Sequence, residues 1–205
     1  MTIVNSWQAP DFTRKTWMLA GILALWAIAV AVLAQTGVYR DVLAPLVGPI
    51  IAADMVLPFV AYFSFLGFRR YIEAISLRKL TAFHVWRTPA ALLFFWYGAR
   101  DWLPEAFVRD AGWGDVGAGV FALIVTLMPE SRGRYLAFHL YGLADLALAL
   151  GTGMTLTLHG DPRTAGILSL PMALIPLYAV GILGATHLMA FDLLRRGVGM
   201  QEVKE

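Results

Sequence analysis

Six long apolar stretches constrain the fold of this chain more than any other feature of its sequence. They lie at about residues 16–38, 43–68, 80–99, 115–129, 135–158 and 167–194. A helix needs roughly 20 apolar residues to cross the hydrocarbon core of a bilayer. In lipid, only helices and closed barrels satisfy every backbone polar group. We therefore predict an all-α, polytopic membrane bundle of about six transmembrane helices, with residues 1–205 as a single integral-membrane domain.

The composition agrees with this class. Hydrophobic residues make up 59% of the chain and charged residues 15%, whereas soluble domains average ~45–50% and about 25%. The first 13 residues contain Pro10 and Asp11 and no apolar h-region, so we expect no signal peptide. The absence of cysteine excludes thiolate metal ligands and cysteine nucleophiles. We expect the lipid bilayer as partner, with a membrane protein or a second copy as further options, and no nucleic acid.

Lysine and arginine residues are distributed unequally between the two ends of the predicted spans. One set of flanks holds eleven of them and the other holds four. The larger set comprises Arg14, Lys15, Arg69, Arg70, Arg78, Lys79, Arg132, Arg134, Arg195, Arg196 and Lys204, and the smaller set comprises Arg40, Arg100, Arg109 and Arg163. Because cytoplasmic flanks carry the positive excess, we place both termini in the cytoplasm of a multi-pass protein of a bacterial-type inner (plasma) membrane.

One short motif occurs twice. Residues 82–86 read Ala-Phe-His-Val-Trp, and residues 137–141 read Ala-Phe-His-Leu-Tyr. In each copy the histidine, His84 or His139, follows a basic residue by five positions and opens a predicted span. Duplication of a parallel unit would explain the repeat, and chance similarity between two apolar helices with the same boundary chemistry explains it as well.

A third histidine comes to a similar depth from the opposite direction. Five residues at ~1.5 Å rise place His84 and His139 roughly 7–8 Å beyond their basic flank. His187 precedes Arg195 by eight residues, which is roughly 12 Å by the same rise. Ionisable groups in hydrocarbon are costly and usually functional. We therefore expect the three imidazoles to share one layer of the inner leaflet.

Buried imidazoles of this kind suggest a cofactor site. Burial favours neutral imidazole, the form that binds metals, so His84, His139 and His187 can ligate a transition-metal ion. Two of them can instead be axial ligands of haem b, with Arg87 near a propionate. Aromatic walls for a haem are available in Phe83, Trp86, Phe138 and Tyr141. Electron transfer would then be the function. Alternatively, the three histidines have separate structural roles. A further alternative is that they line a proton or solute pathway.

Arg87 lies within a predicted span and must face the interior of the bundle. We predict a buried ion pair between Arg87 and Asp145, with Asp54 nearby. The two aspartates are candidates either for proton carriers or for simple neutralisation of Arg87. The second functional hypothesis is accordingly a small proton-coupled transporter, and the third is a non-catalytic membrane subunit or scaffold.

The predicted intramembrane histidines resemble, in part, those of two known families. Paired intramembrane histidines resemble those of the two-haem transmembrane cytochrome b family, which has one pair per membrane side. Here only His159 lies outside, so that resemblance implies one haem at most. Three histidines near the cytoplasmic face resemble the zinc site of the ceramidase and adiponectin-receptor superfamily. The H-x-x-x-H pair of that superfamily is missing, because Phe191 stands four residues after His187. Neither resemblance covers the whole chain.

Two further segments carry local expectations. Residues 112–117 match the pattern G-x-G-x-x-G, but the βαβ context of a dinucleotide site is missing. We expect a helix start with close-packing glycines and Asp115 as its N-cap. Residues 70–80 suggest either an amphipathic interfacial helix or a solvated cytoplasmic connector, and the positive-inside rule favours the connector.

Overall fold

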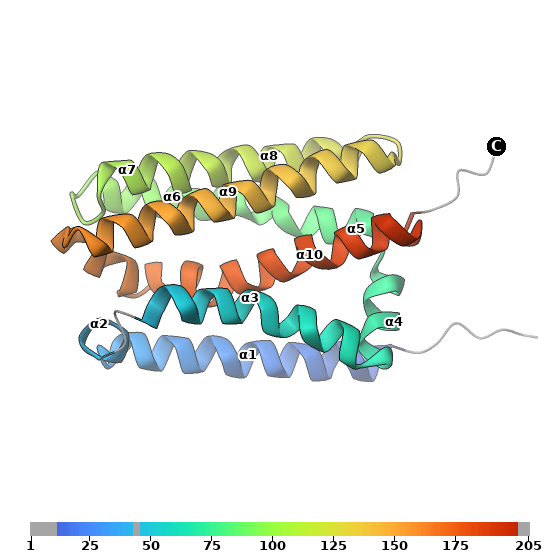
Figure 1. Ribbon diagram of the computed structural model, residues 1–205, viewed down its shortest axis with the longest axis horizontal. Helices are drawn as coiled ribbons and strands as arrows, with labels where there is room; N and C mark the ends of the chain where they lie inside the picture. Colours follow the sequence, from blue (N-terminus) through green and yellow to red (C-terminus); the bar gives the residue numbers. More distant parts are fainter. Residues whose placement is uncertain (1–11, 43–45, 201–205) are drawn as a thin grey trace, which may run out of the picture.

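The structure, a computed structural model, describes residues 12–42 and 46–200 and forms an elongated helical bundle (Figure 1). Its described residues are 86% helical and contain no strand. The elements are α1 (Thr13–Gln35), α2 (Val38–Asp41), α3 (Val47–Ser64), α4 (Leu66–Ile75), α5 (Leu77–Ala82), η2 (Phe83–Trp86), α6 (Arg87–Gly98), α7 (Glu105–Phe107), η3 (Val108–Gly112), α8 (Trp113–Leu127), α9 (Arg132–Leu158), η4 (Pro162–Leu168), η5 (Met172–Leu174), η6 (Ile175–Ala179) and α10 (Val180–Arg196). The predicted all-α class is thereby confirmed.

Within the described ranges, five helical segments are long and apolar enough to cross a membrane. They are Thr13–Gln35, Val47–Ser64, Glu105–Leu127, Arg132–Leu158 and Met172–Arg196. The stretch expected at 80–99 lies in a continuous helical run of α5, η2 and α6. This run is less apolar than the five because it carries His84 and Arg87. The number of six spans therefore stays a prediction, while a multi-pass membrane protein is compatible with the five.

The last span lies at the centre of the bundle, and the first lies at its edge (Figure 1). In the 18-residue apolar core of Met172–Arg196, 61% of the residues are buried in the bundle. The corresponding share in Thr13–Gln35 is 6%. Glycines let α3 approach α10 closely, as small residues do in membrane interfaces. A Cβ on Gly181 would lie 2.8 Å from the Cβ of Asp54, and one on Gly184 would collide with Met55. Exposed α1 side chains such as Trp17 face the surroundings of the bundle.

Helix α4 crosses the end of the bundle where α10 finishes (Figure 1). Its buried side chains include Tyr71 and Ile72. The expected solvated connector is therefore wrong for this segment, which is a packed amphipathic helix. Arg69 pairs with Glu73 and Arg78 pairs with Glu130, whereas Arg70 and Lys79 remain exposed.

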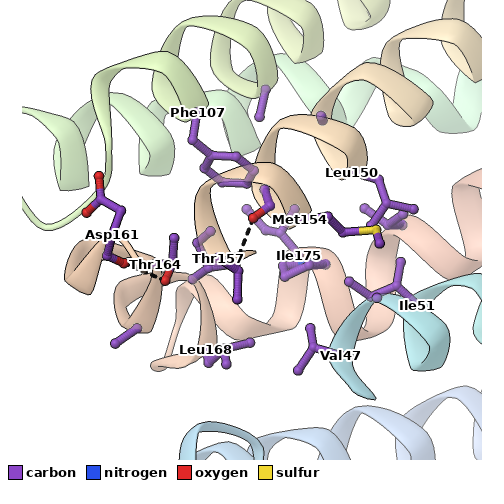
Figure 2. A pocket seen from close by; sticks show the side chains of 18 of the residues that line it. Val47, Ile51, Phe107, Leu150, Met154, Thr157, Asp161, Thr164, Leu168 and Ile175 are labelled. Carbon is purple, nitrogen blue, oxygen red and sulfur yellow. Dashed lines mark hydrogen bonds between the residues drawn. The ribbon is translucent and has the colours of Figure 1, made fainter. Parts of the chain in front are cut away.

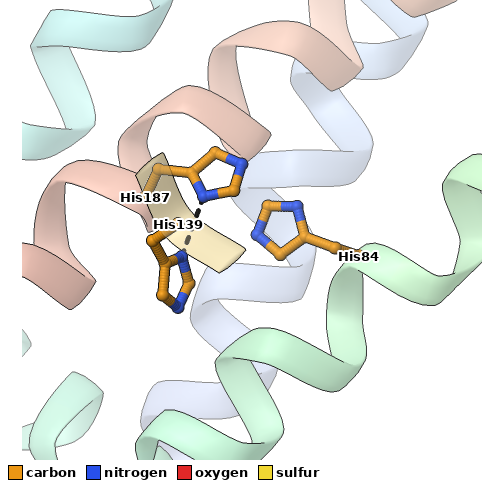
Figure 3. A group of neighbouring side chains, drawn as sticks. All are labelled: His84, His139 and His187. Carbon is orange, nitrogen blue, oxygen red and sulfur yellow. Dashed lines mark hydrogen bonds between the residues drawn. The ribbon is translucent and has the colours of Figure 1, made fainter. Parts of the chain in front are cut away.

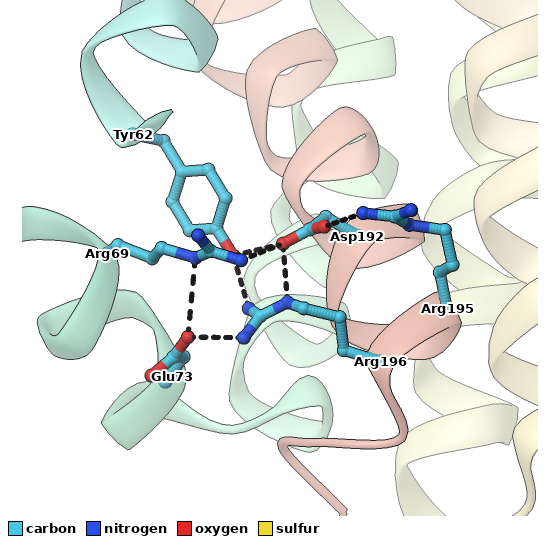
Figure 4. A network of polar contacts seen from close by, with 6 residues as sticks. All are labelled: Tyr62, Arg69, Glu73, Asp192, Arg195 and Arg196. Carbon is cyan, nitrogen blue, oxygen red and sulfur yellow. Dashed lines mark hydrogen bonds and ion pairs between the residues drawn. The ribbon is translucent and has the colours of Figure 1, made fainter. Parts of the chain in front are cut away.

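A network of ion pairs and hydrogen bonds fixes α4 to α10 (Figure 4). Arg196 reaches Glu73 at 2.7 Å and Asp192 at 2.8 Å. The Tyr62 hydroxyl donates to Asp192 at 2.7 Å, and Arg69 lies 3.5 Å from the same carboxylate. Asp192 thus balances Arg196, and it also joins α3 and α4 to the end of α10.

Candidate metal centre

The local backbone places His84 in a tightened turn. Residues Phe83–Trp86 form a 3-10 helix between α5 and α6. Pro89 follows closely, and a proline has no N–H to offer the carbonyl four residues before it, here that of Val85, and crowds it. Pro89 therefore accounts for the tightened turn that carries His84. The imidazole of His84 is completely buried.

The three histidines meet in the core of the bundle (Figure 3). His139 from α9 and His187 from α10 are also completely buried. Their Nδ1 atoms lie 2.8 Å apart, and the rings of His84 and His187 stack with centroids 4.1 Å apart. One nitrogen from each ring lies within 4.8 Å of the others. The three imidazoles therefore share one layer.

Threonine hydroxyls hold two of the rings from outside. The Thr186 hydroxyl lies 3.0 Å from Nε2 of His84, and the Thr81 hydroxyl lies 3.3 Å from Nε2 of His139. Metal-binding histidines are usually oriented in this way by a partner on their other nitrogen. Nδ1 of His84 and Nδ1 of His139 therefore face the cluster, where Nδ1 of His139 contacts His187.

Gly142 makes room for the third ring. A Cβ at this position on α9 would collide with the imidazole of His187. The close approach is specific, because it lets the ring of His187 lie against the backbone one turn from His139.

Two ring nitrogens in the cluster have no partner within the described part of the chain. They are Nδ1 of His84 and Nε2 of His187. Buried polar atoms without hydrogen bonds are costly, and a metal ion would satisfy such a lone pair. Two nitrogens bound to tetrahedral zinc at about 2.0–2.1 Å lie about 3.3 Å apart. The observed separations, 2.8 Å between Nδ1 of His139 and Nδ1 of His187 and up to 4.8 Å within the set, bracket that distance.

A haem fits this packing less well than a single ion. Two axial imidazoles must face each other across a flat macrocycle. Here His84 stacks directly on His187, and His139 contacts His187 through Nδ1. The rings themselves fill the space that a macrocycle would need. Arg87, expected beside a propionate, is bonded instead to acidic side chains.

Arg87 forms a buried three-residue ion cluster just beyond His84. Its Nε donates to Oδ1 of Asp115 at 2.7 Å, and its Nη2 bonds to Asp145. All three side chains are buried. The predicted contact between Arg87 and Asp145 is present. Asp115 is the partner that sequence reasoning missed.

Asp115 was misplaced because its helix starts earlier than expected. Helix α8 begins at Trp113 and continues from α7 and η3, so Asp115 is an interior residue rather than the N-cap. The glycines near Asp115 in the sequence could have indicated that this part of the helix packs closely against its neighbours. A Cβ on Gly114 would collide with Asp145, and one on Gly119 with Thr88. These glycines bring α8 against α9 and α6, where Arg87 lies.

Asp54 lies apart from this cluster, contrary to expectation. It packs against Gly181 of α10, and within the described residues it forms no ion pair with Arg87. The physical reason is the position of α3, which packs on α10 rather than beside α6 and α8. His159, expected to be solvated, is exposed at the end of α9.

Comparison with known proteins adds a family without an assigned activity. Residues 46–195, nearly three quarters of the chain, match the model of a family described as "Domain of unknown function (DUF8737)". The chain belongs to the DUF8737 family. The matched region contains the three histidines and the ion cluster of Arg87. No curated protein and no solved structure matches the chain.

Proposed function

We propose that this protein binds one transition-metal ion inside the membrane through His84, His139 and His187. One observation carries the proposal: three completely buried imidazoles place one nitrogen each within 4.8 Å of the others. Burying three imidazole rings in a membrane core without a ligand would cost free energy. The ion would bind Nδ1 of His84 and Nε2 of His187, which otherwise lack partners, and Nδ1 of His139 would exchange its contact with His187 for the ion.

The three imidazole nitrogens restrict which metal ions can bind. Neutral imidazoles suit zinc and copper, and also iron or nickel, whereas magnesium and calcium prefer oxygen ligands. Three protein nitrogens leave a fourth position of a tetrahedral ion open to water or a small molecule. An open position is typical of reactive rather than structural sites. Haem b is the alternative cofactor, and electron transfer would be the role of either a haem or a redox-active ion.

The ion cluster of Arg87 complements a bound cation. One guanidinium pairs with the two carboxylates of Asp115 and Asp145, so the fully ionised cluster carries one surplus negative charge. Arg87 follows His84 by three residues, about 4.5 Å along a helix. In a medium of low dielectric constant, this surplus charge favours a nearby metal cation. From the charge bias of the flanks, we place the site in the cytoplasmic half of the inner membrane, with both termini in the cytoplasm.

A proton-coupled carrier is the second candidate, and the contact between two histidine nitrogens favours it. A hydrogen bond joins Nδ1 of His139 to Nδ1 of His187 at 2.8 Å, a geometry in which a proton can pass between rings. Arg87 and Asp145 would then form the charged part of the pathway, with Asp115 in the place expected for Asp54. A scaffold role would leave both clusters without a ligand.

Elemental analysis and an absorption spectrum of the protein purified in mild detergent test the proposal. We expect about one zinc, copper or iron ion per chain and no Soret band. The His187→Ala variant should lose the ion, and the His159→Ala variant, altered at an exposed histidine, should keep it. A folded wild-type protein that stays metal-free after growth with these metals contradicts the proposal. A Soret band supports haem b instead.

A further inference from the structure

A cavity lies between α3, α9 and the irregular segment before α10 (Figure 2), toward the opposite end of the bundle from α4 (Figure 1). Its volume is about 420 Å³, within the range of about 300–1,000 Å³ that is typical of small-molecule sites. Apolar side chains from all sides form its walls, among them Ile51, Phe107, Leu150 and Ile175. The histidine cluster does not line it.

Irregular backbone borders this cavity on two sides. The π-helical turns η3 and η6 each contribute to the walls, through Ala111 in η3 and through Ile175 and Pro176 in η6. Non-helical backbone at membrane depth is tolerated where it is buried in protein or lines a cavity. Turns of π-helix inside longer helices occur often at functional sites. Two such turns around one cavity indicate a built binding site.

The polar groups of the cavity differ between its two ends. Arg40 and Asp161 line it near the connecting loops, and Asp115 lines it within the bundle. Arg87 bonds to Asp115 through Oδ1. Among the side chains that the structure describes, Oδ2 of Asp115 has no hydrogen-bond partner, and 11% of the Asp115 side chain remains accessible. A carboxylate oxygen in an apolar cavity requires a donor to offset its burial.

The charge of the groups around Asp115 determines which kind of hydrogen-bond donor the cavity can bind. One guanidinium, that of Arg87, contacts the carboxyl groups of both Asp115 and Asp145. With both carboxyl groups ionised, the cluster has one surplus negative charge, and in apolar surroundings that charge attracts a cation strongly. We infer that the cavity binds one long-chain aliphatic amine, with its ammonium donating to Asp115 and its hydrocarbon chain along the apolar walls. This site is separate from the metal centre and does not require a bound ion.

Three probes of equal chain length test the inference: dodecylamine, dodecanol and dodecyl sulfate. Each is added at equal mole fraction to metal-free protein in nanodiscs of zwitterionic lipid, and the unfolding temperature is measured. We expect dodecylamine to stabilise the protein at about tenfold lower concentration than dodecanol, and dodecyl sulfate to give no stabilisation. Equal effects of amine and alcohol, as a bilayer acyl chain in the cavity would produce, overturn the inference.

Variants locate the effect. Ala149→Phe fills the cavity, whereas Leu148→Phe places the same ring on the exposed side of α9. Stabilisation by dodecylamine should disappear in the first variant and persist in the second. Asp115→Asn should abolish the tenfold preference for the amine over the alcohol. If Ala149→Phe does not fold, the Asp115→Asn comparison decides, and an unchanged preference in that variant overturns the inference.

Discussion

At the scale of single residues, the proposed metal centre depends on the space around its histidines as much as on the histidines themselves. His187 lies against the backbone of α9 only because position 142 is a glycine. The hydroxyls of Thr81 and Thr186 fix the rotation of the other two rings. Such partners of a ligand are part of a metal site, since they set its orientation and basicity.

Substitution of Gly142 tests this use of space. Gly142→Ala should displace the ring of His187 and lower the metal affinity by at least about tenfold, the range that affects ligand orientation. Gly151→Ala is the matched control on α9, because a Cβ there meets nothing within 4 Å. It should leave the affinity unchanged and stabilise the helix by up to about 1 kcal/mol. Metal titration of both purified variants gives the answer, and equal affinities would show that His187 does not need this contact.

At the scale of the helices, the Arg87 cluster joins α6, α8 and α9. Removing the arginine leaves two buried carboxylates without their counter-charge. We expect Arg87→Met to lower the free energy of unfolding by about 3–5 kcal/mol, the usual cost of breaking a buried ion pair. Asp115→Asn combined with Asp145→Asn in the same chain should recover part of that loss.

A surface arginine provides the comparison. Arg100 lies 3.9 Å from the centre of the Trp96 ring and is exposed. Arg100→Met should cost no more than about 1 kcal/mol, as expected for an exposed cation–π contact. Denaturant titration in detergent measures both variants. Similar losses for Arg87→Met and Arg100→Met would contradict a structural role for the buried cluster.

The sequence predicted well how far along its helix each polar residue lies. It predicted poorly how each helix is rotated and which helices contact one another. Depth follows from apolar length and basic flanks, which is why His84, His139 and His187 could be assigned to one layer. Neighbours depend on which helices touch, and one sequence does not contain that information. Asp54 was therefore assigned to Arg87, although α3 packs on α10. Asp115 was assigned to a helix start, because the span was expected to begin at about residue 115, whereas α8 begins at Trp113 and continues from α7 and η3.

At the scale of the whole molecule, orientation rests on the positive-inside bias. The chain has no cysteine, so single cysteines can report accessibility from either side. Gly133→Cys lies on the flank expected in the cytoplasm, and His159→Cys lies on the opposite one. In intact cells, a membrane-impermeant maleimide should label His159→Cys at once and Gly133→Cys only after permeabilisation. The reverse pattern would invert the topology and move the metal centre to the outer half of the membrane.

The central claim is that three histidines from three helical segments bind the same ion. X-ray absorption spectroscopy of the metal-loaded protein tests it most directly. For zinc we expect three imidazole nitrogens at about 2.0–2.1 Å in the wild-type protein, and no zinc–imidazole contribution in the His187→Ala variant, which should lose the ion. A first shell of oxygen alone, or an imidazole contribution unchanged by His187→Ala, would contradict the claim.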